Sequence, residues 1–159
     1  MRRSAGILLY RVVGDGDGGD NGRVEVLLGH MGGPFWAKKD AGAWTIPKGE
    51  YEADEDPFVA ACREFVEETG IALPHGPITD LGEVRQSGGK VVRAWAIEGD
   101  LDAATAVSNT FEIEWPPRSG RMTTFPELDR FEWFDPQTAR SRIVVAQRQL
   151  LDRLLSPDA

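Results

Sequence analysis

The sequence is short of cysteine and of long apolar runs. Its 159 residues include a single cysteine, Cys62. One cysteine excludes an internal disulfide, which fits a reducing compartment, so we expect a cytoplasmic protein. No apolar run approaches the roughly 20 residues that a membrane-spanning helix needs, so we expect no membrane partner. The apolar run that begins after Arg3 stops at Arg11, too early for the core of a signal peptide, and we expect a strand there instead.

Positive charge is scarce as well. Lysine and arginine number 18 against 26 aspartates and glutamates, which gives a net charge of -8. An acidic surface repels polyphosphate backbones, so we expect no nucleic-acid partner. A small phosphate ligand stays compatible with this charge, because a metal ion can mediate its binding. The length suffices for one domain with a core but not for two, so residues 1–159 are predicted to form a single domain.

Strand-like and helix-like stretches alternate along the chain. Asp56 is a favoured N-cap, Pro57 is favoured at the first helical position and Gly70 is a typical stop, so a helix is predicted over 57–69. Residues 48–50 before it are expected to turn the chain. Further helices are predicted from Pro136 and over 144–155, a loop over 14–22, and strands over 4–13, 23–29, 44–47, 78–86, 90–98, 111–115 and 131–134. Interleaved strands and helices predict an α/β fold, with helices around a mixed sheet.

The predicted helix 57–69 carries three glutamates at helical spacing. Glu64, Glu67 and Glu68 fall on one side of it. The other side carries four apolar residues: Phe58, Ala61, Cys62 and Phe65. We therefore expect the apolar side to pack on the sheet and the three carboxylates to stand together on the exposed side.

Carboxylates so placed repel one another, by roughly 0.2–0.5 kcal/mol per pair, and such faces are often merely solvated. The same arrangement suits magnesium, which takes oxygen ligands and keeps positions for water and phosphate oxygens. Gly49 in the preceding segment could supply a backbone carbonyl. Arg63 could hold one glutamate, and Glu55 could accept the same arginine. Spacing alone leaves a metal site and a solvated face as equal alternatives.

The stretch GEYEADEDPFVAACREFVEETGI, residues 49–71, resembles the Nudix box, G-x5-E-x7-R-E-U-x-E-E-x-G-U, where U is a bulky apolar residue. Every position is filled at the right spacing, by Gly49, Glu55, Arg63, Glu64, Phe65, Glu67, Glu68, Gly70 and Ile71. The lead-in WTIPKG, residues 44–49, is similar to that of many Nudix hydrolases. The resemblance implies the family's α/β/α sandwich around a mixed sheet.

The resemblance also implies an activity, namely metal-dependent hydrolysis of the diphosphate linkage in a nucleoside diphosphate linked to another moiety. The implied cofactor is Mg²⁺ or Mn²⁺, which would neutralise phosphate charge and align an attacking water. The three helical glutamates would be metal ligands, and one of them could act as general base. Gly49 would offer its carbonyl to a metal, while Arg63 and Glu55 would form the pair that orients the glutamates.

Many members of the family use a further acid outside the box. Candidates in this chain are Glu112, Glu114, Glu127, Asp129 and Glu132. Glu112 and Glu127 are preferred, because each lies near an expected strand end or loop. For each candidate, an ordinary surface carboxylate is the alternative.

Substrate-binding residues are predicted less sharply. Lys48 could contact phosphates as a point charge. Trp44 could stack on a base, although a core tryptophan is the commoner arrangement. Arg118 and Arg121 could receive phosphates or simply be solvated.

The substrate is expected to be a nucleoside triphosphate, oxidised ones included, or a dinucleoside polyphosphate. ADP-ribose enzymes of the family tend to have a proline where this chain has Gln86. An inositol pyrophosphate substrate, a catalytically silent nucleotide-binding or regulatory module, and an acidic interaction domain are the alternatives. The chain is expected to be a monomer or a homodimer.

Overall fold

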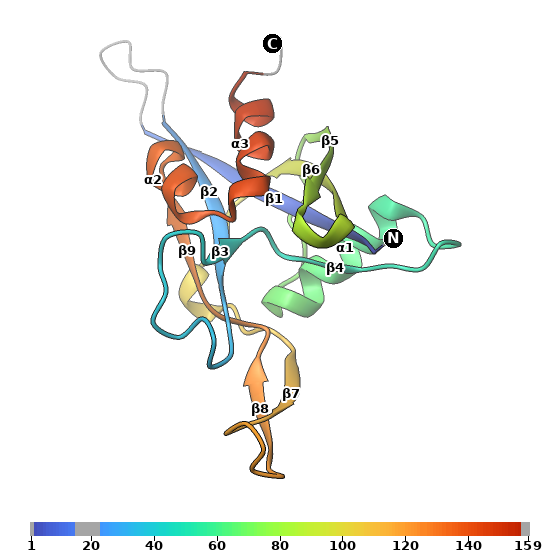
Figure 1. Cartoon of the computed structure of the whole chain (residues 1–159). Coiled ribbons are helices and arrows are strands. Elements are labelled where there is room, and N and C mark those ends of the chain that lie inside the picture. The colour runs from blue at the N-terminus through green and yellow to red at the C-terminus, as the bar shows by residue number, and fades with distance from the viewer. Residues whose placement is uncertain (1, 15–22, 157–159) are drawn as a thin grey trace.

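A computed structural model describes residues 2–14 and 23–156. Its main sheet contains β1 (Arg3–Val13), β2 (Arg23–Met31), β3 (Trp44–Thr45), β4 (Lys48–Glu50), β5 (Ile78–Gln86), β6 (Lys90–Glu98) and β9 (Leu128–Phe134). The strand order is β3-β2-β1-β6-β5, with β4 paired to β1 and β9 to β2. Strands β1 and β6 run parallel and the other pairs antiparallel, so the predicted mixed sheet is confirmed (Figure 1).

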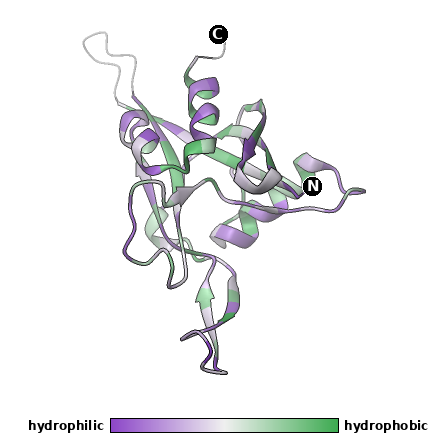
Figure 2. Cartoon of the chain, viewed as in Figure 1, coloured by the Kyte–Doolittle hydropathy of each residue, from purple (hydrophilic) through white to green (hydrophobic). Residues whose placement is uncertain are grey.

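Helices cover both faces of this sheet. Successive residues of a strand point to opposite faces, so Leu8 packs in one core and Ile7 and Leu9 in the other. The core of Leu8 is closed by α2 (Pro136–Arg142) and α3 (Arg148–Leu155), and the core of Ile7 by Phe65 of α1 (Pro57–Thr69). Both α1 and α3 carry hydrophobic and hydrophilic residues along their length, as Figure 2 shows. In the described ranges, none of the helices is long and apolar enough to cross a membrane.

Several element boundaries agree with the sequence prediction. Helix α1 spans 57–69 as predicted: the Asp56 carboxylate accepts the amide of Val59, and Gly70 ends the helix with φ 69°. Strands β5 and β6 also have the predicted bounds and are joined by a short 3-10 turn over Ser87–Gly89. Of the predicted loop over 14–22, residues 15–22 lie outside the described part of the chain.

Two local predictions are wrong. Residues 48–50 form strand β4 rather than a turn, because Gly6 of β1 has no side chain to keep Lys48 away, and the two strands pair closely. The predicted helix over 144–155 is interrupted: a 3-10 turn, Val145–Gln147, precedes α3. Leu150 and Leu151 of α3 are buried, whereas Leu155 at its end is 42% exposed.

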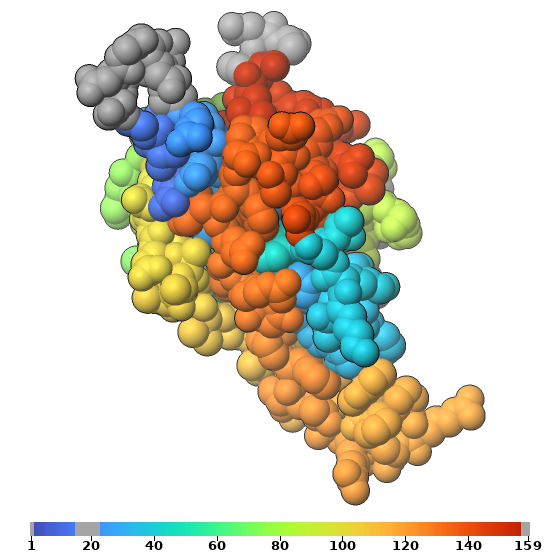
Figure 3. Space-filling view, turned by 90° about the vertical axis from the view of Figure 1, so that its left-hand side faces the viewer, coloured from blue at the N-terminus to red at the C-terminus, as the bar shows by residue number. Residues whose placement is uncertain are grey.

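Residues 99–127 contain two strands, of which the sequence predicted only one. The expected strand in 111–115 is β7 (Thr110–Glu114), and β8 (Met122–Pro126) pairs with it in a separate two-stranded sheet. This hairpin projects from the body of the protein (Figures 1 and 3). Trp115 beyond β7 meets Phe35 edge-to-face, with ring centroids 5.4 Å apart, so the hairpin rests against the 32–43 segment.

Candidate functional site

The acidic side of α1 faces strand β4 rather than solvent. Glu64 and Glu68 are each only 6% exposed, while Glu67 is exposed. The prediction that all three would stand on an exposed side is therefore wrong for Glu64 and Glu68. The helix packs against β4 as well as against β1 and β6 of the same sheet, and β4 covers the side that carries Glu64.

Gly49 of β4 lies directly against the Glu64 carboxylate. A Cβ built on Gly49 would be 2.0 Å from Glu64 Oε2, so only glycine allows this approach. Gly49 pairs with Ala5 in the antiparallel ladder of β4 and β1. On either side of this pair, the amide of Ile7 donates to the Pro47 carbonyl and the amide of Tyr51 donates to the Arg3 carbonyl. The alternation of an antiparallel ladder makes this a hydrogen-bonded pair, and a carbonyl has two lone pairs, so the Gly49 oxygen keeps one for another ligand.

Arg63 holds the carboxylates around it. Its guanidinium donates two bonds to Glu55, from Nε at 3.1 Å and from Nη2 at 3.2 Å. The remaining Nη1 donates to Glu64 at 2.9 Å and to Glu67 at 3.3 Å. These bonds, with Glu55 first among them, raise the pKa of Arg63 further above its usual value. The contact between Arg63 and Glu55 expected from the sequence is thus present, and it joins the loop before α1 to two of the helical acids.

The acids line a hollow that we call the acid cavity, of about 430 Å³. Its walls bring together the β4 segment, the acidic side of α1, and residues from elsewhere in the chain. It is lined by Arg2, Ser4, Lys48, Gly49, Glu50, Glu64, Glu67, Glu68, Lys90, Asn109 and Glu127. Five carboxylates, from β4, from α1 and from the loop before β9, therefore face one small volume, together with two lysines and Arg2.

Glu127 reaches this cavity through a chain of backbone hydrogen bonds. The amide of Asn109 donates to the Glu67 carbonyl at 3.0 Å, near the end of α1 where carbonyls lack helical partners. The Asn109 carbonyl accepts the amide of Glu127 at 2.8 Å, and the Glu127 carbonyl accepts the amide of Gly32 at 2.9 Å. Glu127 is thereby fixed relative to the acidic helix, although about sixty residues separate them in sequence.

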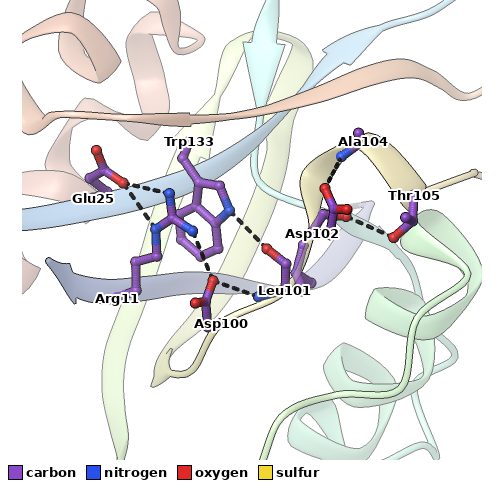
Figure 4. A network of polar contacts seen from close by, with 8 residues as sticks. All are labelled: Arg11, Glu25, Asp100, Leu101, Asp102, Ala104, Thr105 and Trp133. Atoms are coloured by element: carbon purple, nitrogen blue, oxygen red, sulfur yellow. Dashed lines mark hydrogen bonds and ion pairs between the residues drawn. The ribbon is translucent and has the colours of Figure 1, made fainter.

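A second network anchors the segment that leads to Asn109 (Figure 4). Arg11 lies 4.1 Å over the Trp133 ring and pairs at 2.8 Å with both Glu25 and Asp100. The indole N–H of Trp133 donates to the Leu101 carbonyl at 3.1 Å. The connection from β6 to β7 is therefore attached to the sheet at its start and to α1 near its end.

Burial and mutual repulsion raise the pKa values of several acids that line the cavity. Burial, with the charges of Glu127 and Glu64, raises the pKa of Glu68 to about 8. Burial and the neighbouring Glu67 raise the pKa of Glu64, and burial raises the pKa of Glu127. Burial and the charge of Lys90 lower the pKa of Lys48. Grouped acids that resist ionisation in this way are typical of sites that receive a cation.

The residues present fit a divalent metal. Carboxylate and carbonyl oxygens are the ligands that Mg²⁺ and Mn²⁺ prefer, and magnesium uses few of them from protein. Glu64, Glu67, Glu68, Glu127 and the Gly49 carbonyl could hold it. In the part of the chain that the structure describes, no three acidic, histidine or cysteine side chains are arranged so that they could hold a metal ion without moving. Arg63 engages oxygens of Glu64 and Glu67 there.

A second hollow adjoins the acid cavity and has a volume of about 340 Å³. We call it the base cavity, after the nucleobase that we propose below as its ligand. The two share Lys48, Glu68, Lys90 and Glu127. Beyond these, the base cavity is lined by Met31, Trp36, Gly42, Thr45, Ile46, Gln86, Ser87, Leu128, Val144 and Gln147. Its lining combines apolar side chains such as Met31, Trp36 and Leu128 with polar and charged ones, so it offers both packing surface and hydrogen-bonding groups to a small molecule.

Four residues predicted for the site lie elsewhere. Trp44 is 1% exposed and packs edge-to-face on Phe134 in the core, so it has no face for a base. Glu112 is exposed on β7 opposite Thr124, outside both cavities. Arg118 and Arg121 are exposed in the turn of the projecting hairpin and line neither cavity.

Among the lining residues that were not expected from the sequence are Trp36, Lys90 and Gln147. Trp36 lies in the glycine-rich segment 32–43, where an aromatic residue in irregular structure is itself a signal of a binding role. Lys90 begins β6 and lines both cavities. Gln147 is fully buried, and only its pairing with residues a hundred positions earlier reveals its role.

Comparison with known proteins gives matches over most of the chain. A family model described as NUDIX domain matches residues 2–154. An RNA pyrophosphohydrolase of Rhizobium meliloti is 28% identical over 127 residues, 71% of this chain and 71% of that protein. An octanoyltransferase of Myxococcus xanthus is 34% identical over 102 residues, which are 64% of this chain but only 25% of that protein.

The fold has neighbours among solved structures. The crystal structure of a C. elegans Ap4A hydrolase binary complex has a TM-score of 0.61 and 21% identity. The match covers 98% of this chain and 96% of that one. At this identity the likeness shows the shared fold, and it agrees with the sandwich predicted from the sequence.

Proposed function

Because the chain belongs to the Nudix family of hydrolases, which act on acid anhydrides, we propose that it is a metal-dependent nucleotide pyrophosphohydrolase. Its preferred substrate is a nucleoside triphosphate, oxidised forms included. One observation carries the proposal. The acid cavity, with five carboxylates, adjoins the base cavity, and the two share lining residues, among them Lys48 and Lys90.

The two cavities match the two parts of such a substrate. The base cavity offers Trp36, Met31 and Leu128 as apolar surface for a nucleobase. Lys48 and Lys90 lie where the two cavities join and are placed to hold the phosphates as point charges. With the base in one cavity, the phosphate chain is directed toward the glutamates.

The chemistry required is attack of water on one phosphorus atom of the anhydride. The P–O bond to the leaving phosphate breaks, and the proton of the water passes to a carboxylate of the acid cavity. A bound divalent metal would neutralise the phosphate charge and favour ionisation of the attacking water. Glu64, Glu67, Glu68, Glu127 and the Gly49 carbonyl would hold it. Arg63, itself held by Glu55 of the loop before α1, keeps Glu64 and Glu67 in place.

A dinucleoside polyphosphate is the second candidate. The acid cavity is lined by Arg2 in addition to the two lysines, so cations for a longer phosphate chain are present. The net charge of -8 disfavours a long nucleic acid, although a relative is named for RNA pyrophosphohydrolysis.

The proposal is tested by phosphate-product release with and without magnesium. The panel comprises nucleoside triphosphates and their oxidised forms, dinucleoside polyphosphates, RNA with a 5′-triphosphate, and inositol pyrophosphates. We expect magnesium-dependent cleavage of nucleoside triphosphates. Cleavage of another class would replace the substrate, and binding without cleavage by the folded chain would point to a regulatory module.

A further inference from the structure

The side-chain amide of Gln147 is fixed in one orientation beneath the base cavity. The backbone N–H of Ile46, which can only donate, bonds to Gln147 Oε1 at 3.1 Å. The hydroxyl of Thr45 gives its hydrogen to the Ile46 carbonyl at 2.9 Å, so it can only accept from Gln147 Nε2, also at 2.9 Å. Both neighbours therefore require the same placement of oxygen and nitrogen on Gln147, which is fully buried.

The fixed orientation of Gln147 in turn fixes the side-chain amide of Gln86, at the end of β5. The second hydrogen of Gln147 Nε2 is donated to Gln86 Oε1 at 3.0 Å. A rotated Gln86 amide would set two NH₂ groups against each other and leave a buried donor unpaired, which is costly. Gln86 therefore keeps its oxygen toward Gln147 and its NH₂ group turned away. Within the described residues, no group accepts a bond from Gln86 Nε2, and Gln86 lines the base cavity.

We propose that Gln86 is a specificity-determining residue that selects the nucleobase. Because its amide cannot rotate to suit the ligand, it offers a hydrogen-bond donor only. A base with a carbonyl oxygen at the contacted edge, a 6-oxopurine or a 4-oxopyrimidine, pairs with this donor. A base with an exocyclic amino group at that edge places this amino group against the NH₂ group of Gln86, and two donors form no hydrogen bond. The inference rests on the proposed function, since it places the base of the nucleotide in the base cavity.

The cavity suits this assignment in size and polarity. Its volume of about 340 Å³ lies at the lower end of the range for small-ligand pockets. Its apolar lining includes Trp36 and Val144, while Lys48 and Lys90 mark the side shared with the acid cavity. A donor whose orientation is fixed discriminates between bases, because a mismatched base leaves two donors facing each other with no hydrogen bond between them.

The test compares nucleotides that differ at the exocyclic group. Hydrolysis of inosine and adenosine triphosphates is measured with magnesium, and likewise of uridine and cytidine triphosphates, each as kcat/KM. We expect the parent to favour the oxo member of each pair by roughly three- to tenfold, the range of one neutral hydrogen bond. Gln86→Glu should reverse the preference, because its carboxylate still accepts from Gln147 but presents an acceptor to the base.

Two further variants separate specificity from general damage. Gln86→Met removes the donor without adding charge and should bring the ratio of each pair close to one. Gln149→Glu makes the same charge change at an exposed position of α3 outside both cavities and should keep the parent's ratios. The ratio within a pair is unaffected by any uniform loss of rate that the added carboxylate causes.

Binding of inosine and adenosine monophosphates, followed by calorimetry, distinguishes this inference from the proposed function. Tighter binding of the inosine nucleotide, lost in Gln86→Met, supports the role of Gln86 even if no triphosphate is hydrolysed. Hydrolysis with equal ratios in the parent and both Gln86 variants would overturn the inference and leave the proposed function standing. Equal or absent binding together with absent hydrolysis would overturn both.

Discussion

The carboxylate of Glu64 occupies the space that a side chain on Gly49 would need. The nearest carboxylate oxygen lies 2.0 Å from the position of a Cβ on residue 49. Strand β4 and helix α1 are therefore joined at the acid cavity by direct contact between backbone and carboxylate. The glycine at the start of the Nudix box has a steric role in this chain, whatever its carbonyl binds.

Gly49→Ala should therefore both destabilise the protein and impair the site. Forcing a methyl group into occupied space typically costs about 1–3 kcal/mol. Because the clash is with Glu64, the cost of Gly49→Ala should shrink when Glu64→Ala is also present. Urea unfolding of the parent, both single variants and the double variant measures this coupling. Additive costs would show that the two residues do not compete for the same space.

Arg63→Lys should lower activity while leaving the fold nearly intact. Lysine keeps the charge but cannot bond Glu55 through two nitrogens and reach Glu64 and Glu67 from a third. The network is partly exposed, so its contribution to stability should be about 1 kcal/mol or less. Turnover and magnesium affinity should fall by tenfold or more, by the size of effects seen on removing groups that orient metal ligands.

Arg140→Lys is the matched control for this change, because Arg140 pairs with Asp152 between α2 and α3, away from both cavities. It should behave like the parent. Unchanged turnover and metal affinity in Arg63→Lys would remove Arg63 from its role in orienting the glutamates.

Substitution by alanine should mainly affect nucleotide binding at Trp36 and mainly affect stability at Trp44. Trp36→Ala removes a wall of the base cavity, so it should raise KM for the nucleotide. Because Trp36 is only partly buried against the core, the change should cost less stability than Trp44→Ala. Trp44→Ala removes a buried core side chain and should cost about 3–5 kcal/mol in the free energy of unfolding. Steady-state kinetics and chemical unfolding of both variants check this. A normal KM in Trp36→Ala would place the base elsewhere.

Asp135 should make the start of α2 sensitive to acid. Its carboxylate accepts the amide of Thr138 at 2.7 Å, and this bond lowers the pKa of Asp135. A lowered pKa gives stability that is present above the unfolded-state value of about 3.9 and is lost as pH falls through the folded value. Asp135→Asn keeps an accepting oxygen but does not titrate.

The difference in free energy of unfolding between the parent and Asp135→Asn should therefore be constant above about pH 5 and change below about pH 4. Urea unfolding across this range measures it. A difference that stays constant down to pH 2 would mean that the bond to Thr138 does not depend on the charge.

The sequence predicted those features that depend on local signals. The cap, proline and glycine around α1 gave its bounds, and the spacing of the box gave the acids that gather in the acid cavity. Burial of Glu64 and Glu68 could not be predicted, because it depends on β4 crossing the flank of the helix. That crossing depends in turn on the contact between Gly6 and Lys48, which no periodicity along the chain reveals.

Residues outside the box were harder to place for the same reason. Glu112 and Glu127 were equivalent in sequence, and only the backbone bonds from Glu67 through Asn109 bring Glu127 to the cavity. Trp44 and Trp36 both lie next to glycines in the sequence, yet the pairing of β3 with β2 buries Trp44. Long-range pairing decided each case.

We propose above all that the acid cavity is a metal-dependent hydrolytic site. Glu67→Gln is the most direct test, because Glu67 is exposed and its loss should leave the fold intact. Glu112→Gln, the same change outside the cavity, is the control. The measurement is magnesium-dependent turnover of a nucleoside triphosphate by the parent and both variants. We expect turnover to fall by orders of magnitude in Glu67→Gln alone, by roughly 100-fold or more. Turnover by Glu67→Gln that equals the parent, or parent turnover that is indifferent to magnesium, would contradict the account.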